Sequence, residues 1–141
     1  MLEVLIAALV LAIGVLACSA AIMRSTQSLV DNLHRQRAVR LASNLAELLR
    51  GVSLTTAITA TVSKQPPAVA DDCWTTICDS SQLVQTNLHR WHQQLRQELP
   101  SGQSNIYVDR DSGIPHAKIT VTWRASGDRI SQHSVTAPLA Q

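Results

Sequence analysis

The side chains that could ligate a metal ion are few and lie far apart in the sequence. The chain has five histidines, of which His89 and His92 stand three residues apart and could share an ion. Leu88 and Trp91 define the apolar face of the helix expected there, however, which places both imidazoles on its solvated flank. The remaining histidines have no acidic or cysteine neighbour at ligand spacing: His34, His116 and His133. We therefore expect no metal site and no cofactor.

The spacing of two cysteines predicts a local disulfide. Four residues separate Cys73 from Cys78, which does not match the two-residue spacing of zinc ribbons or thioredoxin-like pairs, and no second pair exists. A disulfide that closes a small loop is the interpretation we favour, and it implies an oxidising compartment. Two free buried thiols are the alternative. Cys18 lies in an apolar run, where a cysteine behaves as a small apolar residue.

Signatures of catalysis and of nucleic-acid binding are missing from the sequence. It contains no GxSxG, no HExxH and no glycine-rich phosphate loop. The formal net charge is only +2, without the basic field that nucleic-acid binding needs. The acidic pairs Asp71 with Asp72 and Asp109 with Asp111 are typical of turns, with calcium binding as the alternative. We expect no enzymatic activity and no nucleic-acid partner.

The elements that carry these side chains begin with an apolar helix. Residues 4–23 contain no charge and would span about 30 Å as a helix, the thickness of a bilayer core. This run is too long and uniform for the apolar region of a signal peptide, and a buried core helix would need more surrounding chain than this length allows. We expect it to lie in the lipid bilayer, with these residues in the apolar core: Val4, Leu5, Ile6, Leu9, Leu11, Ile13, Gly14 and Leu16. Glu3 is then a carboxylate at the edge of the run, either functional or simply at headgroup level.

The helix is expected to continue beyond the membrane. No proline interrupts residues 24–50, and Gly51 is placed like a C-terminal cap. Leucines recur there at helical spacings and form a stripe for packing against a soluble domain: Leu29, Leu33, Leu41, Leu45, Leu48 and Leu49. The predicted organisation is a membrane half of the helix over 1–23, a soluble half over 24–51 and a head domain over 52–141.

The head domain is expected to open with a loop and a second helix. Residues 52–72 are rich in Thr, Ala and Ser, and we predict a loop there with one short strand near 57–62. Asp79 and Gln82 form a capping-box pattern that predicts a helix start. An apolar face follows at steps of three and four: Val84, Leu88, Trp91, Leu95 and Leu99. The run Pro100-Ser101-Gly102 ends the helix.

The spacing of apolar residues then changes to two, which predicts strands. We expect strands over 105–109, 116–125 and 129–137, joined by turns at 109–113 and 126–128. The middle strand has one apolar face: Ala117, Ile119, Val121 and Trp123. The prediction is an α+β head whose three-stranded antiparallel sheet packs one face against the helices. Its core is expected to include Leu88, Trp91, Leu95, Ile119, Val121 and Trp123.

Charge and cysteine usage disagree on the orientation of the head. Several arginines follow the membrane run and nothing basic precedes it, so the positive-inside rule would place the head in the cytoplasm: Arg24, Arg35, Arg37 and Arg40. The disulfide expected between Cys73 and Cys78 favours an oxidising compartment instead.

The opening MLEVLIAALVLAIGVLA, with Glu3 before an uninterrupted apolar run, strongly resembles the N-terminus of type IV pilins. Later segments resemble the PilV-type minor pilins, the type IV pilus modification proteins. They are the helix end RLASNLAELLRG, the cysteine pair, the W-x3-L-x3-LP-x-G run at 91–102 and the ITVTW strand at 119–123. The resemblance covers most of the chain and implies a pilin-like fold.

The resemblance also implies an inner-membrane prepilin with a single membrane pass and a periplasmic head. Such a protein is cut by a prepilin peptidase and N-methylated, and an inner-membrane assembly platform adds it to a pilus. There its N-terminal helix packs with other major and minor pilins, which serves twitching motility or adhesion. Glu3 matches the pilin glutamate that pairs with the N-terminal amine of a neighbouring subunit. A lone carboxylate in an apolar helix bundle needs such a cationic partner, and the pair fixes the axial register.

The chain departs from the pilin pattern at two places. Met1 stands inside the motif, so we expect the basic leader, the glycine before the cut and the first two mature residues to be encoded upstream. That leader would resolve the orientation in favour of the periplasm. The proline of major pilins beyond Gly14 is absent, with Ala20 near its place, which leaves loosening of the helix open. Two other functions remain open on the sequence: a minor pseudopilin of type II secretion, and a membrane-anchored module that binds a ligand or metal.

Overall fold

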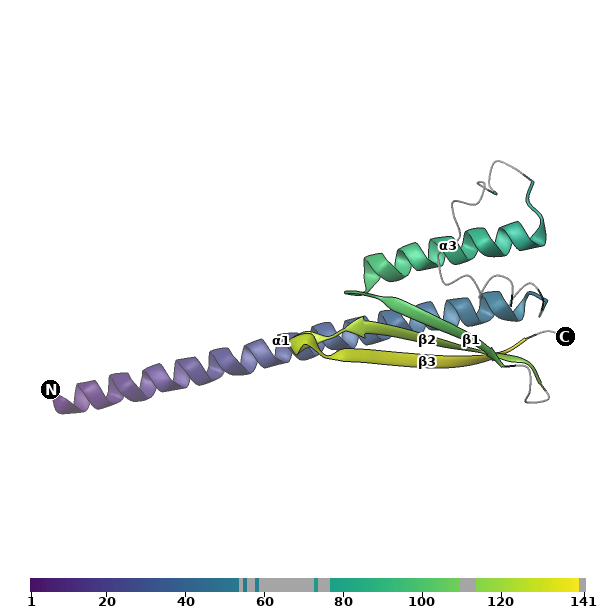
Figure 1. The fold of residues 1–141 in the computed structure, drawn as a ribbon. Helices are drawn as coiled ribbons and strands as arrows, with labels where there is room; N and C mark the ends of the chain where they lie inside the picture. The colour runs from purple at the N-terminus through teal and green to yellow at the C-terminus, as the bar shows by residue number, and fades with distance from the viewer. Residues whose placement is uncertain (54, 56–57, 59–72, 74–76, 110–113, 140–141) are drawn as a thin grey trace. The chain divides into compact units, whose positions relative to one another are not determined.

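The computed structural model describes residues 1–53, 55, 58, 73, 77–109 and 114–139. They belong to two compact units, Met1–Leu33 and His34–Gln141, and one helix, α1 (Leu2–Arg50), runs through both. The second unit also contains the helix α3 (Ser80–Glu98) and the strands β1 (Gln103–Asp109), β2 (His116–Arg124) and β3 (Ile130–Pro138) (Figure 1). This confirms the predicted α+β, pilin-like arrangement of a long helix, a second helix and a three-stranded antiparallel sheet.

The first unit consists of the N-terminal part of α1 alone. By length and composition this helix is apolar enough to cross a membrane, and none of its most apolar window is buried within the described chain. A core helix of a globular protein would be mostly buried, so the exposure argues against that alternative.

The buried face of α1 begins in the second unit. It is made of leucines alternating with alanines: Ala38, Leu41, Ala42, Leu45, Ala46 and Leu49. Leu29 and Leu33 were expected on this packing stripe, but they are 61% and 43% exposed, so that part of the prediction is wrong. Helical spacing determines which side chains share a face, but it does not determine how far along the helix the packed domain reaches.

The helix α3 starts at its predicted cap. The Asp79 side chain accepts from the Gln82 backbone N–H at 2.7 Å, and the Gln82 side chain accepts from the Asp79 N–H at 3.0 Å. This is the complete capping box. Leu99 is extended and ends the helix. A Cβ on Gly102 would stand 2.7 Å from the Leu95 carbonyl oxygen, so the turn from α3 toward β1 requires a residue without a side chain there.

The strands form one antiparallel sheet in the order β1-β2-β3. The strand β1 starts earlier than the predicted residue 105 because β2 is long enough to pair with it, Gln103 lying opposite Thr122. The turn Ser126–Asp128 precedes β3 as predicted, with Gly127 at a φ of 72°. The strand β3 lies at one edge of the sheet and carries no Asp, Glu, Lys or Arg.

One core joins the buried face of α1 to α3 and to the inner face of the sheet. The six residues expected in the core are all buried: Leu88, Trp91, Leu95, Ile119, Val121 and Trp123. Further members of the same cluster come from α3 and from around β3: Val84, Leu99, Ala137 and Leu139. The strand predicted near 57–62 lies outside the described residues except for Ile58, which is helical. Residues 71, 72 and 110–113, predicted as turns, also lie outside them.

Candidate assembly site on the N-terminal helix

Glu3 lies in the first turn of α1, where the aligned peptide dipoles favour a negative charge. Its neighbours along the chain are exposed apolar side chains: Leu2, Val4, Leu5 and Ile6. The ion pairs found among the described residues all join other groups. Glu3 thus has no ion-pair partner among the described residues.

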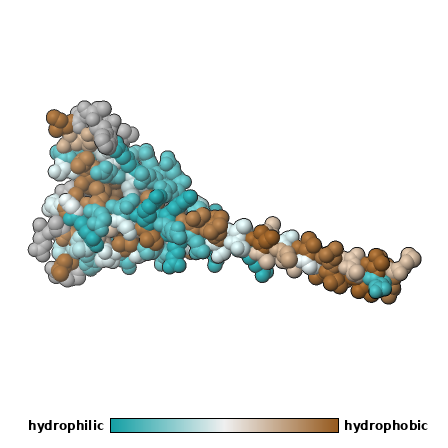
Figure 2. Space-filling model, turned by 180° about the vertical axis from the view of Figure 1, so that it is seen from behind, coloured by the Kyte–Doolittle hydropathy of each residue, from teal (hydrophilic) through white to brown (hydrophobic). Residues whose placement is uncertain are grey.

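The N-terminal part of α1 is an apolar surface that the rest of the described chain leaves uncovered. The large side chains expected in the membrane are all exposed: Val4, Leu5, Ile6, Leu9, Leu11, Ile13 and Leu16. Gly14 has nothing within 4 Å of the position that a Cβ would take. Hydrophobic side chains cover much of this part of the helix in Figure 2. A surface of this kind is suited to lipid or to other apolar helices.

Two hydroxyl side chains in this part of α1 bond to the helix itself. Ser19 Oγ donates to the Val15 carbonyl oxygen at 2.9 Å, and Thr26 Oγ1 donates to that of Met23 at 2.9 Å. Such bonds back to the preceding turn let a hydroxyl enter an apolar medium without an outside partner. Cys18 is a free, exposed thiol. Glu3 differs from these residues because a charge cannot be satisfied in this way.

Apolar exposure continues beyond Arg24, the first charged residue after the apolar run. Leu29, Val30 and Leu33 are exposed in the described chain, although they stand at helical neighbour spacings. The sequence pattern identified the two leucines as a packing face. In the structure these side chains are not buried by the described part of the chain.

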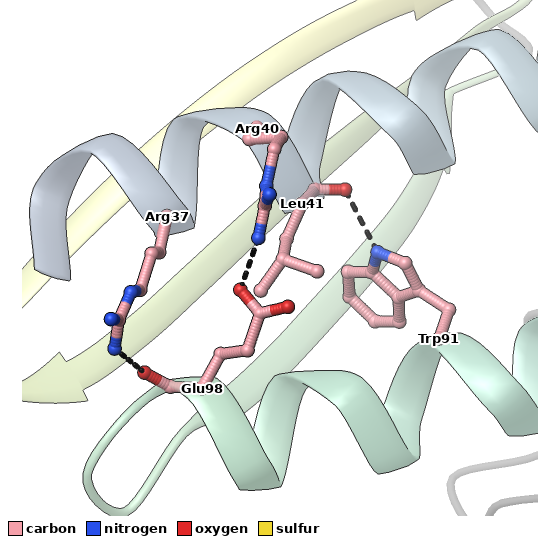
Figure 3. Close-up of polar contacts among 5 residues, drawn as sticks. All are labelled: Arg37, Arg40, Leu41, Trp91 and Glu98. Atoms are coloured by element: carbon pink, nitrogen blue, oxygen red, sulfur yellow. Dashed lines mark hydrogen bonds and ion pairs between the residues drawn. The ribbon is translucent and has the colours of Figure 1, made fainter.

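Three polar contacts tie α3 to α1 in the second unit (Figure 3). Arg40 Nη2 lies 2.6 Å from Glu98 Oε2, and Arg37 Nη1 donates to the Glu98 carbonyl oxygen at 3.4 Å. Trp91 Nε1 donates to the Leu41 carbonyl oxygen at 2.8 Å. Sequence reasoning treated the two arginines only as charges that set membrane orientation. Nothing local in the sequence signals these contacts, since about sixty positions separate the arginines from Glu98.

The cysteines are joined as the sequence predicts. Cys73 and Cys78 form a disulfide with their Cα atoms 5.5 Å apart. Cys73 Sγ lies 3.5 Å from Thr86 Oγ1, so this bridge sits beside the first half of α3. The bridge favours an oxidising compartment for the head.

Two of the histidines are better integrated into the head than the sequence predicted. His92 Nδ1 lies 2.8 Å from the Leu88 carbonyl oxygen and Nε2 lies 3.3 Å from Ser104 Oγ on β1. The ring lies beside the buried face of α3 and is half-buried, so only part of it meets solvent. Burial lowers its pKa from 6.5, the hydrogen bond to Leu88 acts against this, and Arg96 and His89 add to the lowering. His89 is also half-buried and contacts Gln93 at 2.9 Å.

The structure also gives His116 a neighbour that its sequence spacing did not reveal. His116 Nε2 lies 3.6 Å from Asp109 Oδ2, because the two residues are opposite each other in the β1–β2 register. The Nδ1 atom of His34 is buried and has no hydrogen-bond partner among the described residues. No group of three or more His, Cys, Asp or Glu that could hold a metal ion occurs in the part of the chain that the structure describes.

Comparisons with protein-family models, with curated proteins and with solved structures found no match to this chain.

Proposed function

We propose that this chain is a minor pilin of the type IV pilus, which acts in pilus assembly or priming by packing its N-terminal helix with other major and minor pilins. The observation that carries the proposal is Glu3, a carboxylate without a partner in the described chain at the start of an exposed apolar helix. The resemblance of the first 17 residues to type IV pilins supports the same role.

The exposed apolar side chains determine what can cover α1. Lipid would cover the membrane run while the protein is stored in the bilayer. Leu29, Val30 and Leu33 follow the charged residue Arg24, so they would lie outside the apolar core of the membrane. Burial against neighbouring helices would cover both parts at once, and removal of apolar surface from water drives such packing. This favours an assembling subunit over a protein that is only tethered to a membrane.

Glu3 would supply the selectivity that apolar packing lacks. Apolar contacts between helices are non-directional and allow several axial offsets. A carboxylate held in that surface is costly unless a cation lies beside it, so the offset that supplies the cation is strongly preferred. In this proposal the cation is the N-terminal amine of a neighbouring subunit, released by a prepilin peptidase and presented by the inner-membrane assembly platform.

The proposed location is the inner membrane, with one pass and a periplasmic head, followed by assembly into the pilus. The disulfide between Cys73 and Cys78 supports a head outside the reducing cytoplasm. The proposed work is assembly without catalysis. A minor pseudopilin of type II secretion would share the N-terminal helix, and the neighbouring genes would distinguish the two systems.

The test is the substitution Glu3→Ala in the chromosomal gene with its native upstream sequence. We expect the variant to reach the membrane at normal levels and to disappear from sheared pili. Glu47→Ala is the matched control, because Glu47 is an exposed carboxylate on the same helix whose partner is Arg50 at 2.8 Å. Normal recovery of the Glu3 variant from pili would refute the proposal.

A further inference from the structure

The face of the sheet that points away from the core carries mostly amide and hydroxyl side chains. Buried and outward residues alternate along β2, and the strand register places outward side chains of β1 and β3 beside those of β2. Two rows across the strands consist only of amides and hydroxyls: Gln103, Thr122 and Gln132, then Asn105, Thr120 and Ser134. The register runs without a bulge, so these groups form an ordered array with spacings of about 5 Å across the strands and about 7 Å along them.

The next row adds an exposed aromatic ring to this outer face of the sheet. Tyr107 on β1 lies opposite Lys118, which in turn lies opposite Thr136 on β3. Tyr107 is 63% exposed, although it stands within a paired strand. A tyrosine offers a large contact area and loses little conformational freedom on binding, so a ring placed in this way can anchor a ligand.

Charge is scarce on the outer face. Lys118 is the one charged side chain in the three rows, whereas solvated surfaces ordinarily carry a charge at roughly one position in three or four. At the ends of the face, Arg124 Nε lies 3.2 Å from Asp128 Oδ1, and His116 Nε2 lies 3.6 Å from Asp109 Oδ2. The face therefore has little to attract a polyanion. It also lacks the cluster of large apolar side chains that forms the centre of a stable protein interface.

We propose that the outer face of the sheet binds a neutral polysaccharide. The hydroxyls on the rim of a sugar ring can donate to and accept from the amides and hydroxyls of the rows. The C–H groups on the flat side of the ring can stack on Tyr107. Linked sugars repeat both features along a chain, so several weak contacts act together. This inference concerns the head domain and is independent of the proposed pilus role.

Titration of the full chain with soluble oligosaccharides tests this inference. The protein is kept in micelles of a detergent without a sugar headgroup, and the neutral probes are hexamers of β-1,4-linked N-acetylglucosamine and of β-1,4-linked glucose. We expect at least one of them to shift the amide NMR signals of the three strands, with a dissociation constant of about 1 mM or lower, and to leave the signals of residues 2–23 unchanged. No shift of strand signals with either hexamer would overturn the proposal.

An anionic probe tests the part played by charge. A hexamer of galacturonate has hydroxyls and a similar length, but it also carries carboxylates that Lys118 would attract. We expect it to bind more weakly than the better neutral hexamer. Binding that is equally strong or stronger would overturn the proposal, because the lysine and not the polar rows would then carry the interaction.

Variants of Tyr107 test the stacking contact. Tyr107→Phe keeps the ring and should bind within about twofold of the parent, whereas Tyr107→Leu keeps only an apolar side chain and should bind about fivefold more weakly. Ile130→Ala is the matched control, because Ile130 is 81% exposed and lies outside the three rows. Its affinity should equal that of the parent. The amide spectrum shows that each variant is folded. Equal affinities of the Phe and Leu variants, or an equal loss in Ile130→Ala, would overturn the proposal.

Discussion

The indole N–H of Trp91 donates to the backbone carbonyl oxygen of Leu41 at 2.8 Å and so joins two helices that are far apart in the sequence. Trp91 is only 5% exposed, so without this acceptor its N–H would be buried and unsatisfied. Trp123 provides a contrast within the same core. Its Nε1 is also buried, but it has no hydrogen-bond partner among the described residues.

This contrast allows the contribution of the Trp91 hydrogen bond to the free energy of unfolding to be measured. Trp91→Phe and Trp123→Phe both remove an indole N–H and a similar volume from the core, but only the first removes a hydrogen bond between described residues. We expect Trp91→Phe to lower the free energy of unfolding by about 1 kcal/mol more than Trp123→Phe does. Urea unfolding of the full chain in detergent micelles, followed by tryptophan fluorescence, measures both losses. Equal losses would contradict the assigned role.

The ion pair between Arg40 and Glu98 should contribute little to stability. The side chains are 61% and 28% exposed, so water and salt screen the charges despite the short contact. Glu98→Gln should lower the free energy of unfolding by less than about 1 kcal/mol, and this loss should shrink in high salt. Glu47→Gln, at the more exposed pair with Arg50, should cost still less. A loss that does not depend on salt would show that Glu98 acts through something other than this pair.

Gly102 should tolerate no side chain. In Gly102→Ala the new Cβ would stand 2.7 Å from the Leu95 carbonyl oxygen, which is fixed in the last turns of α3. We expect the free energy of unfolding to fall by about 2 kcal/mol, which is typical of an overpacked site. Gly51→Ala is the control, because its nearest neighbour would be the Leu48 carbonyl oxygen at an ordinary 3.7 Å. Similar unfolding midpoints for the two variants would show that the turn after α3 can rearrange.

The capping box should stabilise the first turn of α3. Asp79→Ala removes the acceptor of the Gln82 N–H and should cost about 1 kcal/mol. Amides of the first turn should lose more protection in hydrogen exchange than amides near Leu95 do. Ser81→Ala, at an exposed position of the same turn, should have little effect. Unchanged first-turn protection in Asp79→Ala would mean that other contacts fix the start of the helix.

Much of the fold could be read from local sequence patterns. The capping box at Asp79 and Gln82, and the alternation along β2, each involve residues that are close in the sequence and act through short-range geometry. The stripe on α1 was assigned correctly as a face, but it was extended too far, to Leu29 and Leu33. Where a packed face ends depends on the size and position of the domain against it, which local periodicity does not contain.

The contacts between distant elements could not be read in the same way. His92 meets Ser104 only because α3 ends at Glu98 and the chain turns back at Gly102 into β1. The pairing of Arg40 with Glu98 depends on the antiparallel packing of two helices. Glu3, by contrast, stands out by its position beside a long apolar run, but position alone leaves its role open. Its assignment to assembly depends on the resemblance to type IV pilins and stays a prediction.

The uncharged edge strand β3 has a consequence for handling the protein at high concentration. Natural sheets discourage aggregation along their edges with charged side chains, prolines or bulges. Between Ile130 and Pro138, β3 has no charged residue of the Asp, Glu, Lys or Arg types, and its proline comes only at the last position. Preparations without native neighbours should therefore tend toward strand-to-strand aggregation, and Gln132→Lys, at an exposed position in the strand, should keep them dispersed.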